Sequence, residues 1–308
     1  MSHQKDDKNM QLAAIDIGSN AIRLIIGEKT ETGSLRILKK YREPIRLGAE
    51  VFNGGVLSAQ IIEQTANAFV QFRGVIDQFQ IQKVKAVATS ALRDAENKKQ
   101  LIDLVYEKSK IQIQVITGME EARLIHSAVQ HHLDISKNTV LLIDIGGGSV
   151  ELTISKNGKP IQSKSFQIGT VRTLDQMRRL KISEQHINLV LSDYMQEILE
   201  FMNYSDHIDF AIGTGGNFEC MGDLKHLILK KEPKTHLSYL ELDEIKMHLK
   251  KTTIPDRIEK LKLRPDRADV ILIATKITQL ILRQAEIQKL IIPYVGLREG
   301  ILWSMLKN

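Results

Sequence analysis

AAIDIGSN at residues 13–20 and LLIDIGGGS at residues 141–149 share one pattern, in which an apolar strand ends in an aspartate and a turn of small residues. When Asp16 is aligned with Asp144, Leu24 falls on Leu152, so that each turn leads into a second apolar strand. Because the aspartate, the turn and the return strand all coincide, an internal duplication is a better interpretation than a chance likeness between apolar strands. The sequence therefore predicts two similar lobes.

Strand and helix patterns alternate along the rest of the chain, which is typical of an α/β protein with a mixed sheet. Ser58 is a predicted helix cap, and the apolar residues after it recur at helical spacing as far as Phe79. The other predicted strands are 12–17, 22–26, 35–39, 84–88, 111–116 and 208–212, and the other predicted helices are 95–108, 120–133, 171–201 (one helix or two), 240–250 and 268–287. We expect a first lobe at residues 1–134 and a second at 135–308, with a final helix at about 298–308 that could pack back on the first lobe.

Composition narrows the class of protein. The chain has 308 residues, of which 43% are hydrophobic and 26% are charged, as in an ordinary globular protein. A single cysteine, Cys220, allows neither an internal disulfide nor a zinc site, and no apolar run is long enough to span a bilayer. We expect a cytoplasmic protein without membrane insertion. The net charge of +6 suits a polyanionic ligand but is common in proteins that have none.

The two turns of small residues are candidates for phosphate binding. They consist of Gly18, Ser19 and Asn20 in the first half and of Gly146, Gly147, Gly148 and Ser149 in the second. Backbone N–H groups in such turns can converge on a phosphate, and glycine permits its close approach. One such turn would more simply be a plain hairpin, but two copies in a duplicated chain favour a clamp on one phosphate chain. A weaker candidate, for a nucleotide loop, is the cluster Gly213, Thr214, Gly215 and Gly216 after a predicted strand.

Carboxylates near these turns are candidates for a magnesium site. Glu151 lies on the return strand of the second hairpin, where it alternates with apolar Val150 and Leu152. It can therefore share a cleft with Asp144, and the two could bind magnesium directly or through water. A glutamate that simply faces solvent is an equally good interpretation. Asp16, the corresponding residue of the first hairpin, is the third candidate metal ligand.

Two adjacent glutamates have different predicted roles. Thr117 and Glu120 have the spacing of a helix capping box. Glu121 shares a helix face with Leu124 and Ile125, so its carboxylate should point toward the interior or a cleft. At such a place it could act as a general base that deprotonates water for in-line attack on a terminal phosphorus.

Arg93 is a candidate catalytic residue and phosphate ligand, because its guanidinium could neutralise phosphate charge. It follows the predicted strand 84–88 and lies just past its end, where α/β proteins gather ligands. A guanidinium suits bidentate contact with phosphate, although a surface arginine is a simple alternative in a basic chain. The sequence contains no nucleophile elbow and no Walker loop, and Cys220 has no histidine signature nearby, so direct attack by water is the simpler mechanism.

Several segments together resemble the exopolyphosphatase and guanosine pentaphosphate phosphatase family (Ppx/GppA) in its short, two-domain form. The segments are AIDIGSN at 14–20, ATSALR at 88–93, GMEEARLI at 118–125, IDIGGGSVEL at 143–152, IGTVR at 168–172, RADV at 267–270 and GLREGIL at 296–302. They occur in the family's order and extend over nearly the whole chain. The resemblance implies a duplicated ribonuclease-H-like fold of the actin-like ATPase superfamily, with two lobes and a central cleft.

The resemblance also implies roles for individual residues. Glu121 matches the catalytic base, and Asp144 and Glu151 match carboxylates that associate with magnesium, for which manganese could substitute. The positions that match phosphate ligands are Ser19, Asn20, Arg93, Gly146, Gly147, Gly148 and Ser149. A homodimer is a further expectation from the family.

Two departures from the family pattern concern the guanosine part of a substrate. The family more often has threonine where Asn217 stands, and it usually has proline and glycine in place of Leu272 and Ala274. These differences put guanosine recognition in doubt more than the phosphate chemistry. The chain ends at Asn308, so we also expect it to lack the C-terminal helical domains of longer members.

The function expected from these residues is hydrolysis of terminal phosphate from inorganic polyphosphate, with guanosine pentaphosphate as a second or shared substrate and no role for nucleic acid polymers. The terminal phosphate would lie between the two hairpin turns. One alternative is a non-catalytic sensor that binds guanosine tetraphosphate. Another is an ATP-dependent kinase or ATPase of the same superfamily.

Overall fold

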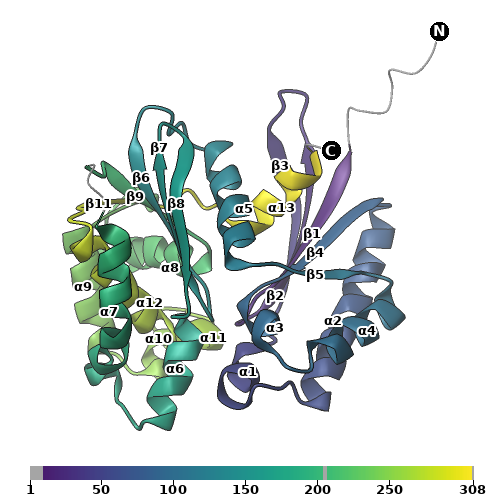
Figure 1. Cartoon of the computed structure of the whole chain (residues 1–308), viewed down its shortest axis with the longest axis horizontal. Helices are drawn as coiled ribbons and strands as arrows, with labels where there is room; N and C mark the ends of the chain where they lie inside the picture. The colour runs from purple at the N-terminus through teal and green to yellow at the C-terminus, as the bar shows by residue number, and fades with distance from the viewer. Residues whose placement is uncertain (1–9, 204–206, 307–308) are drawn as a thin grey trace. The chain divides into compact units, whose positions relative to one another are not determined.

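The computed structural model describes residues 10–203 and 207–306. The chain forms two compact units, one from Met1–His131 with Leu297–Asn308 and the other from His132–Gly296. Each unit has one mixed β-sheet with helices, so the predicted α/β class is confirmed (Figure 1). No helix in the described ranges is both long and apolar enough to cross a membrane.

The first unit contains a five-stranded sheet with the order β3-β2-β1-β4-β5. Its strands are β1 (Gln11–Ile17), β2 (Ile22–Lys29), β3 (Leu35–Glu43), β4 (Lys83–Ala88) and β5 (Ile113–Val115). Strands β1, β2 and β3 form an antiparallel meander, whereas β4 pairs in parallel with both β1 and β5. The helices are α1 (Gly48–Gly54), α2 (Ala59–Gln78), α3 (Ser90–Asp94), α4 (Lys98–Ser109), α5 (Gly118–Gln130) and α13 (Leu297–Leu306).

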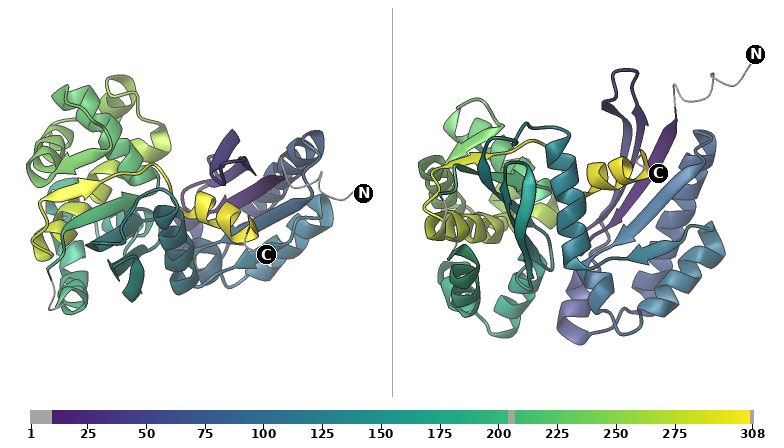
Figure 2. Two further views of the ribbon diagram at one scale, coloured as in Figure 1. Left: turned by 90° about the horizontal axis from the view of Figure 1, so that it is seen from above. Right: turned by 45° about the horizontal axis from the view of Figure 1, so that its top comes forward.

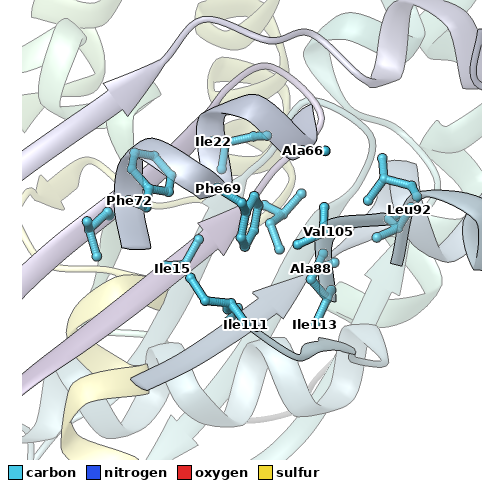
Figure 3. Packing of buried hydrophobic residues seen from close by; sticks show 14 of the residues in the cluster. Ile15, Ile22, Ala66, Phe69, Phe72, Ala88, Leu92, Val105, Ile111 and Ile113 are labelled. Carbon is cyan, nitrogen blue, oxygen red and sulfur yellow. The ribbon is translucent and has the colours of Figure 1, made fainter. Parts of the chain in front are cut away.

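One face of this sheet is covered by α2 and α4, and it forms the larger apolar core of the unit. Ile15 of β1 and Ile22 of β2 belong to one buried cluster with Phe69 and Phe72 of α2, whose rings lie 5.9 Å apart between centroids (Figure 3). The predicted cap of α2 is confirmed, because the Ser58 hydroxyl accepts a hydrogen bond from the Ile61 N–H. Burial of alternate β1 residues on this face explains half of that strand's continuous apolar run.

The other face of the sheet is covered by α5 and α13, which explains the remaining apolar residues of β1. Leu12 and Ala14 belong to a second buried cluster together with Ile301 of α13. The two helices lie side by side at this face (Figure 2). They approach so closely that a Cβ atom on Gly300 would lie 2.1 Å from the carbonyl oxygen of Leu124. The last helix of the chain is therefore part of the same unit as the first strand.

The second unit repeats this arrangement. Its sheet has the order β10-β11-β9-β6-β7-β8. The strands are β6 (Thr139–Ile145), β7 (Val150–Lys156), β8 (Lys159–Phe166), β9 (Phe210–Thr214), β10 (His236–Ser238) and β11 (Lys289–Ile291). An antiparallel meander β6-β7-β8 continues through parallel β9 and β11, as β1-β2-β3 continues through β4 and β5. The predicted duplication is thereby confirmed, and β10 is an addition at the sheet edge.

The helices of the second unit lie mainly between β8 and β11 in the sequence. They are α6 (Thr170–Arg179), α7 (Asn188–Met202), α8 (Gly216–Leu224), α9 (Tyr239–Lys250), α10 (Ile254–Glu259), α11 (Pro265–Ala268) and α12 (Ile271–Gln284). The predicted segment 171–201 thus forms two helices, which are separated by a short 3-10 turn at Glu184–His186.

Candidate phosphate-binding and catalytic residues

The turn after β1 places Gly18, Ser19 and Asn20 at the carboxyl end of that strand. It is closed by a hydrogen bond from the Gly18 N–H to the carbonyl oxygen of Ala21, at 3.2 Å. Asp16, the last polar residue of β1, lies opposite Arg23, and its Oδ2 accepts a hydrogen bond from the Arg23 Nη1 at 3.5 Å. Asp16 therefore has a cationic partner inside its own hairpin, and its role as a metal ligand stays a prediction.

Parallel pairing of β1 with β4 brings this turn against the start of α3. The Ser19 hydroxyl lies 2.9 Å from the hydroxyl of Ser90, and both side chains are buried. The Ser19 carbonyl also accepts a hydrogen bond from the Gly48 N–H at 2.9 Å. Ser90 lies in the segment ATSALR but is not among the predicted site residues. Its hydroxyl holds the Ser19 side chain in position.

Arg93 and Glu121 come together at the same end of the sheet. The short helix α3 follows β4, and Arg93 in it donates a hydrogen bond from Nη1 to the Ile116 carbonyl, at 2.8 Å. The same Nη1 lies 3.7 Å from the Glu121 Oε2, and Glu121 is 5% exposed. Arg93 is thus tied to the backbone beside a buried carboxylate and its side chain is 25% exposed, which argues against the alternative of a surface arginine.

The start of α5 separates the roles of the two adjacent glutamates. The Thr117 N–H donates to the Glu120 Oε2 at 2.8 Å, and the Glu120 N–H donates to the Thr117 hydroxyl at 3.2 Å, which confirms the predicted capping box. These hydrogen bonds lower the pKa of the Glu120 carboxyl. Glu120 therefore caps the helix, and Glu121 in the same first turn is left to face the interior.

The turn after β6 has the same closing hydrogen bond as the turn after β1. Here the Gly146 N–H donates to the Ser149 carbonyl, at 2.9 Å. The carbonyls of Gly146 and Gly147 accept hydrogen bonds from backbone N–H groups at the start of α6, at 2.8–3.0 Å. Within the described part of the chain, the N–H groups of Gly147 and Gly148 donate to no backbone carbonyl. The turn thus has two backbone donors that a phosphate could use.

Gly169, just before α6, holds this turn in place by close approach. A Cβ atom at that position would lie 2.3 Å from the Gly148 nitrogen and 2.4 Å from the Gly147 carbonyl, so a larger residue cannot fit without displacing the turn. The Arg172 Nε donates a hydrogen bond to the Gly148 carbonyl at 2.8 Å. Both residues lie in the segment IGTVR, and their contact with the turn was not predicted.

Asp144 and Glu151 form a pair of carboxylates within the second unit. They are direct partners in the antiparallel register of β6 and β7. Glu151 is 2% exposed and its Oε1 accepts a hydrogen bond from the Ser165 hydroxyl at 2.7 Å, so the alternative of a solvent-facing glutamate is wrong. Like charges directly opposite each other are unfavourable, and hard oxygen donors are the ligands that divalent magnesium prefers. The pair therefore fits a magnesium ion.

The glycine cluster at 213–216 lies next to the Asp144 carboxylate. Strand β9 is parallel to β6 with Thr214 next to Asp144, and the Thr214 hydroxyl donates to the Asp144 Oδ1 at 2.7 Å. Gly215 has a φ of +82°, and a Cβ atom there would lie 2.8 Å from the same oxygen. The Asn217 Nδ2 donates to the Ile145 carbonyl at 2.6 Å, and Asn217 also accepts a hydrogen bond from Arg267. This loop supports Asp144 directly, whatever ligand it contacts.

The sequence is similar to that of known phosphatases. A model of the Ppx/GppA phosphatase family matches residues 25–308. A bifunctional 3-dehydroquinate synthase/phosphatase of Fusobacterium nucleatum is 31% identical over an alignment of 292 residues, and the match covers 90% of this chain but 44% of that protein. The chain thus spans less than half the length of that relative. Exopolyphosphatase 1 of Mycobacterium bovis is 23% identical over an alignment of 310 residues, and the match covers 97% of this chain and 89% of that protein.

Solved structures show the same likeness. The crystal structure of the Ppx/GppA family member from Aquifex aeolicus has a TM-score of 0.80 at 28% sequence identity, covering 97% of this chain and 98% of that one. Sequence and fold therefore give the same relationship over nearly the full length of both chains.

Proposed function

Because the chain belongs to the Ppx/GppA phosphatase family, we propose that it is an exopolyphosphatase, which releases terminal phosphate from inorganic polyphosphate by direct attack of water. The observation that carries this proposal is the pairing of Glu121 with Arg93 at 3.7 Å, at the carboxyl end of the parallel strands β4 and β5. This pairing combines a buried proton acceptor with a fixed phosphate ligand. Such a combination is what in-line phosphoryl transfer to water requires.

In the proposed reaction Glu121 is the general base. Its carboxylate accepts a proton from water as the water oxygen forms a bond to the terminal phosphorus. The anhydride P–O bond breaks, and the shortened polyphosphate leaves with the bridging oxygen. A covalent route through Cys220 is not favoured, because burial raises the pKa of that thiol to about 11 and little thiolate exists near neutral pH.

Phosphate would be bound by Arg93 and by the two turns. The Ile116 carbonyl occupies one N–H of the Arg93 guanidinium, and the remaining donors suit phosphate oxygens. Gly18, Ser19 and Asn20 would contribute from the first unit, and Gly146, Gly147, Gly148 and Ser149 from the second.

Asp144 and Glu151 would hold a divalent cation, for which magnesium is our choice and manganese a substitute. When bound, the ion would offset the negative charge of the two carboxylates and of the phosphate. Thr214 and Ser165 would orient the carboxylates through the hydrogen bonds that they donate to Asp144 and Glu151. Asp16 is a further candidate metal ligand, within the first unit.

Guanosine pentaphosphate is the second proposed substrate, and we expect it to be the poorer one. Asn217, where the family more often has threonine, is buried and occupied by the Ile145 carbonyl and Arg267. Leu272 and Ala274 are buried within α12. These side chains are therefore engaged in packing and not in nucleoside recognition.

The decisive experiment measures phosphate release with magnesium from polyphosphate and from guanosine pentaphosphate in parallel. Glu121→Gln should lower kcat by about 10² to 10⁴, the usual contribution of a general base. Glu120→Gln is the matched control, because glutamine also serves in a capping box, and it should retain near-normal turnover. Full turnover in Glu121→Gln would overturn the mechanism. Release from neither substrate would favour a sensor of guanosine tetraphosphate, which calorimetry with that ligand would then test.

A further inference from the structure

A cavity of about 460 Å³ lies wholly within the second unit and has a lining that is unusually cationic. It is bounded by α7, α9 and α12, and α12 packs against both of the other helices (Figure 1). The charged residues of its lining are Lys246, Lys250, Lys276, Arg283 and Asp243. None of the residues that line it belongs to the candidate site described above.

The cations form two rows, one on α9 and one on α12, and both rows line the cavity. Lys246 and Lys250 lie on one stripe of α9, and Lys276 and Arg283 lie two turns apart on α12. The face that a helix turns toward neighbouring helices is normally apolar. The buried face of α9 is apolar as expected, and the cations lie beside it, with Lys246 half-buried and Lys250 and Arg283 exposed, whereas Lys276 is buried in α12.

Most of this positive charge has no carboxylate partner among the described side chains. Among the lining residues whose side chains the structure describes, Asp243 is the only carboxylate, and it is already engaged by Lys246 and by the Gln279 Nε2. Among the described residues, none places a carboxylate within ion-pair distance of Lys250, Lys276 or Arg283. The cavity therefore keeps a clear excess of positive charge.

Lys276 is the most informative of these residues. It is 7% exposed, and its Nζ donates a hydrogen bond to the Asn188 Oδ1 at 3.2 Å. Burial, together with the nearby Lys250 and Lys246, lowers the pKa of its ammonium to about 8. Glu184 acts in the opposite direction from beyond ion-pair distance. A buried ammonium without a carboxylate in direct contact is costly, and an anion in the cavity would offset that cost.

We propose that this cavity is a second anion site, which binds a small molecule carrying two or more linked phosphate groups. Three cations that lack an ion-pair partner among the described side chains match several negative charges better than one, and the cavity volume is in the range of small-ligand pockets. Free oligophosphate and a nucleoside oligophosphate share this chemistry. The inference does not depend on the proposed function, because it concerns binding without turnover.

The test measures binding of tripolyphosphate, ATP and inorganic phosphate by calorimetry without metal, to the full chain and to three variants. Lys250→Ala and Lys276→Met should each weaken binding of one equivalent of tripolyphosphate about 10-fold or more. Lys251→Ala, which removes an exposed lysine just past the end of α9, is the matched control and should bind as the unaltered protein does. Comparison of tripolyphosphate with ATP shows whether the free or the nucleoside-linked oligophosphate is preferred.

Chemical modification of individual lysines distinguishes binding in this cavity from binding at the catalytic residues. Amine modification of Lys250 and Lys276, followed by mass spectrometry, should be slowed about 10-fold by tripolyphosphate, and that of Lys251 should not. Unchanged modification of Lys276, equal weakening in Lys251→Ala, or equally tight binding of inorganic phosphate would each overturn the proposal. Lys250 is exposed at a helix end, so its variant remains informative if Lys276→Met does not fold.

Discussion

Asp144 and Glu151 are direct cross-strand partners on β6 and β7, and Glu151 is almost completely buried. Two carboxylates in this relation repel each other, and a protein tolerates such a pair when a cation offsets the repulsion. The hydrogen bonds that Thr214 and Ser165 donate hold both carboxylates in place. The pair thus costs stability in the metal-free protein, and this cost can be measured.

Glu151→Gln should stabilise the metal-free protein while it impairs phosphate release. Glutamine keeps a carbonyl oxygen for the Ser165 hydroxyl but removes one of the two facing charges, so we expect a gain of about 0.2–1 kcal/mol in the free energy of unfolding. Urea denaturation in the presence of a chelator measures this gain. Ser165→Ala serves as a comparison, since it removes the hydrogen bond and keeps the charge. A loss of stability in Glu151→Gln would contradict the account of the pair.

Removal of divalent metal should abolish phosphate release, and magnesium should restore it. Magnesium at about 100 times its Kd should stabilise the protein by about 2.7 kcal/mol, because it binds the folded state alone. Thermal unfolding with and without magnesium measures this effect. In Asp144→Asn the increase in Tm should be largely lost. An equal increase in that variant would place the metal elsewhere.

Arg93→Lys should lower kcat/KM for polyphosphate by about 10- to 100-fold, although the charge is kept. The planar guanidinium of arginine can donate to the Ile116 carbonyl and to a phosphate at the same time, whereas the ammonium of lysine cannot reproduce this geometry. Charge-assisted hydrogen bonds contribute about 1.5–3 kcal/mol. Steady-state kinetics at two ionic strengths provide the measurement. Arg123→Lys, at an exposed position of α5, is the control. If both variants behave alike, Arg93 acts only through its charge.

Gly169→Ala should displace the turn that contains Gly147 and Gly148. The added Cβ would lie 2.3 Å from the Gly148 nitrogen, so we expect a loss of about 1–3 kcal/mol in the free energy of unfolding together with weaker phosphate binding. Gly74→Ala is a matched control, because nothing lies within 4 Å of its added Cβ inside helix α2. That substitution should stabilise the protein by about 0.5–1 kcal/mol. Normal activity in Gly169→Ala would show that the turn tolerates movement.

Lys276→Met should be more stable than the unaltered protein at pH 7, and this advantage should shrink as the pH rises toward 10. The folded protein lowers the pKa of Lys276 to about 8 from an ordinary 10.5, so the unfolded chain binds more protons between these values. Stability of the unaltered protein therefore rises with pH in this window relative to the variant. The groups acting on Lys276 are Lys246, Lys250, Glu184 and Asn188. A difference that stays constant from pH 7 to pH 10 would contradict the assigned pKa.

Local features were predictable because they depend on residues close together in the sequence. The cap at Ser58 and the capping box of Thr117 and Glu120 each involve residues within three positions of one another. Turn chemistry and strand alternation likewise identified both hairpins, including the acidic residues that end their first strands. The inward direction of Glu121 followed from helical spacing, and its burial agrees with that prediction.

The sequence by itself determined the duplicated strand-turn-strand units, the α/β class and the family, because periodicity, turn residues and motif order carry that information. Only the tertiary structure decided which distant residues meet. Ser19 reaches Ser90 and Asp144 reaches Thr214, pairs that are 71 and 70 residues apart, since β1 pairs in parallel with β4 and β6 with β9. Likewise, the lysines of α9 and α12 face one cavity because those helices pack together. Parallel strand pairing and helix packing bring together side chains whose sequence positions do not reveal their proximity.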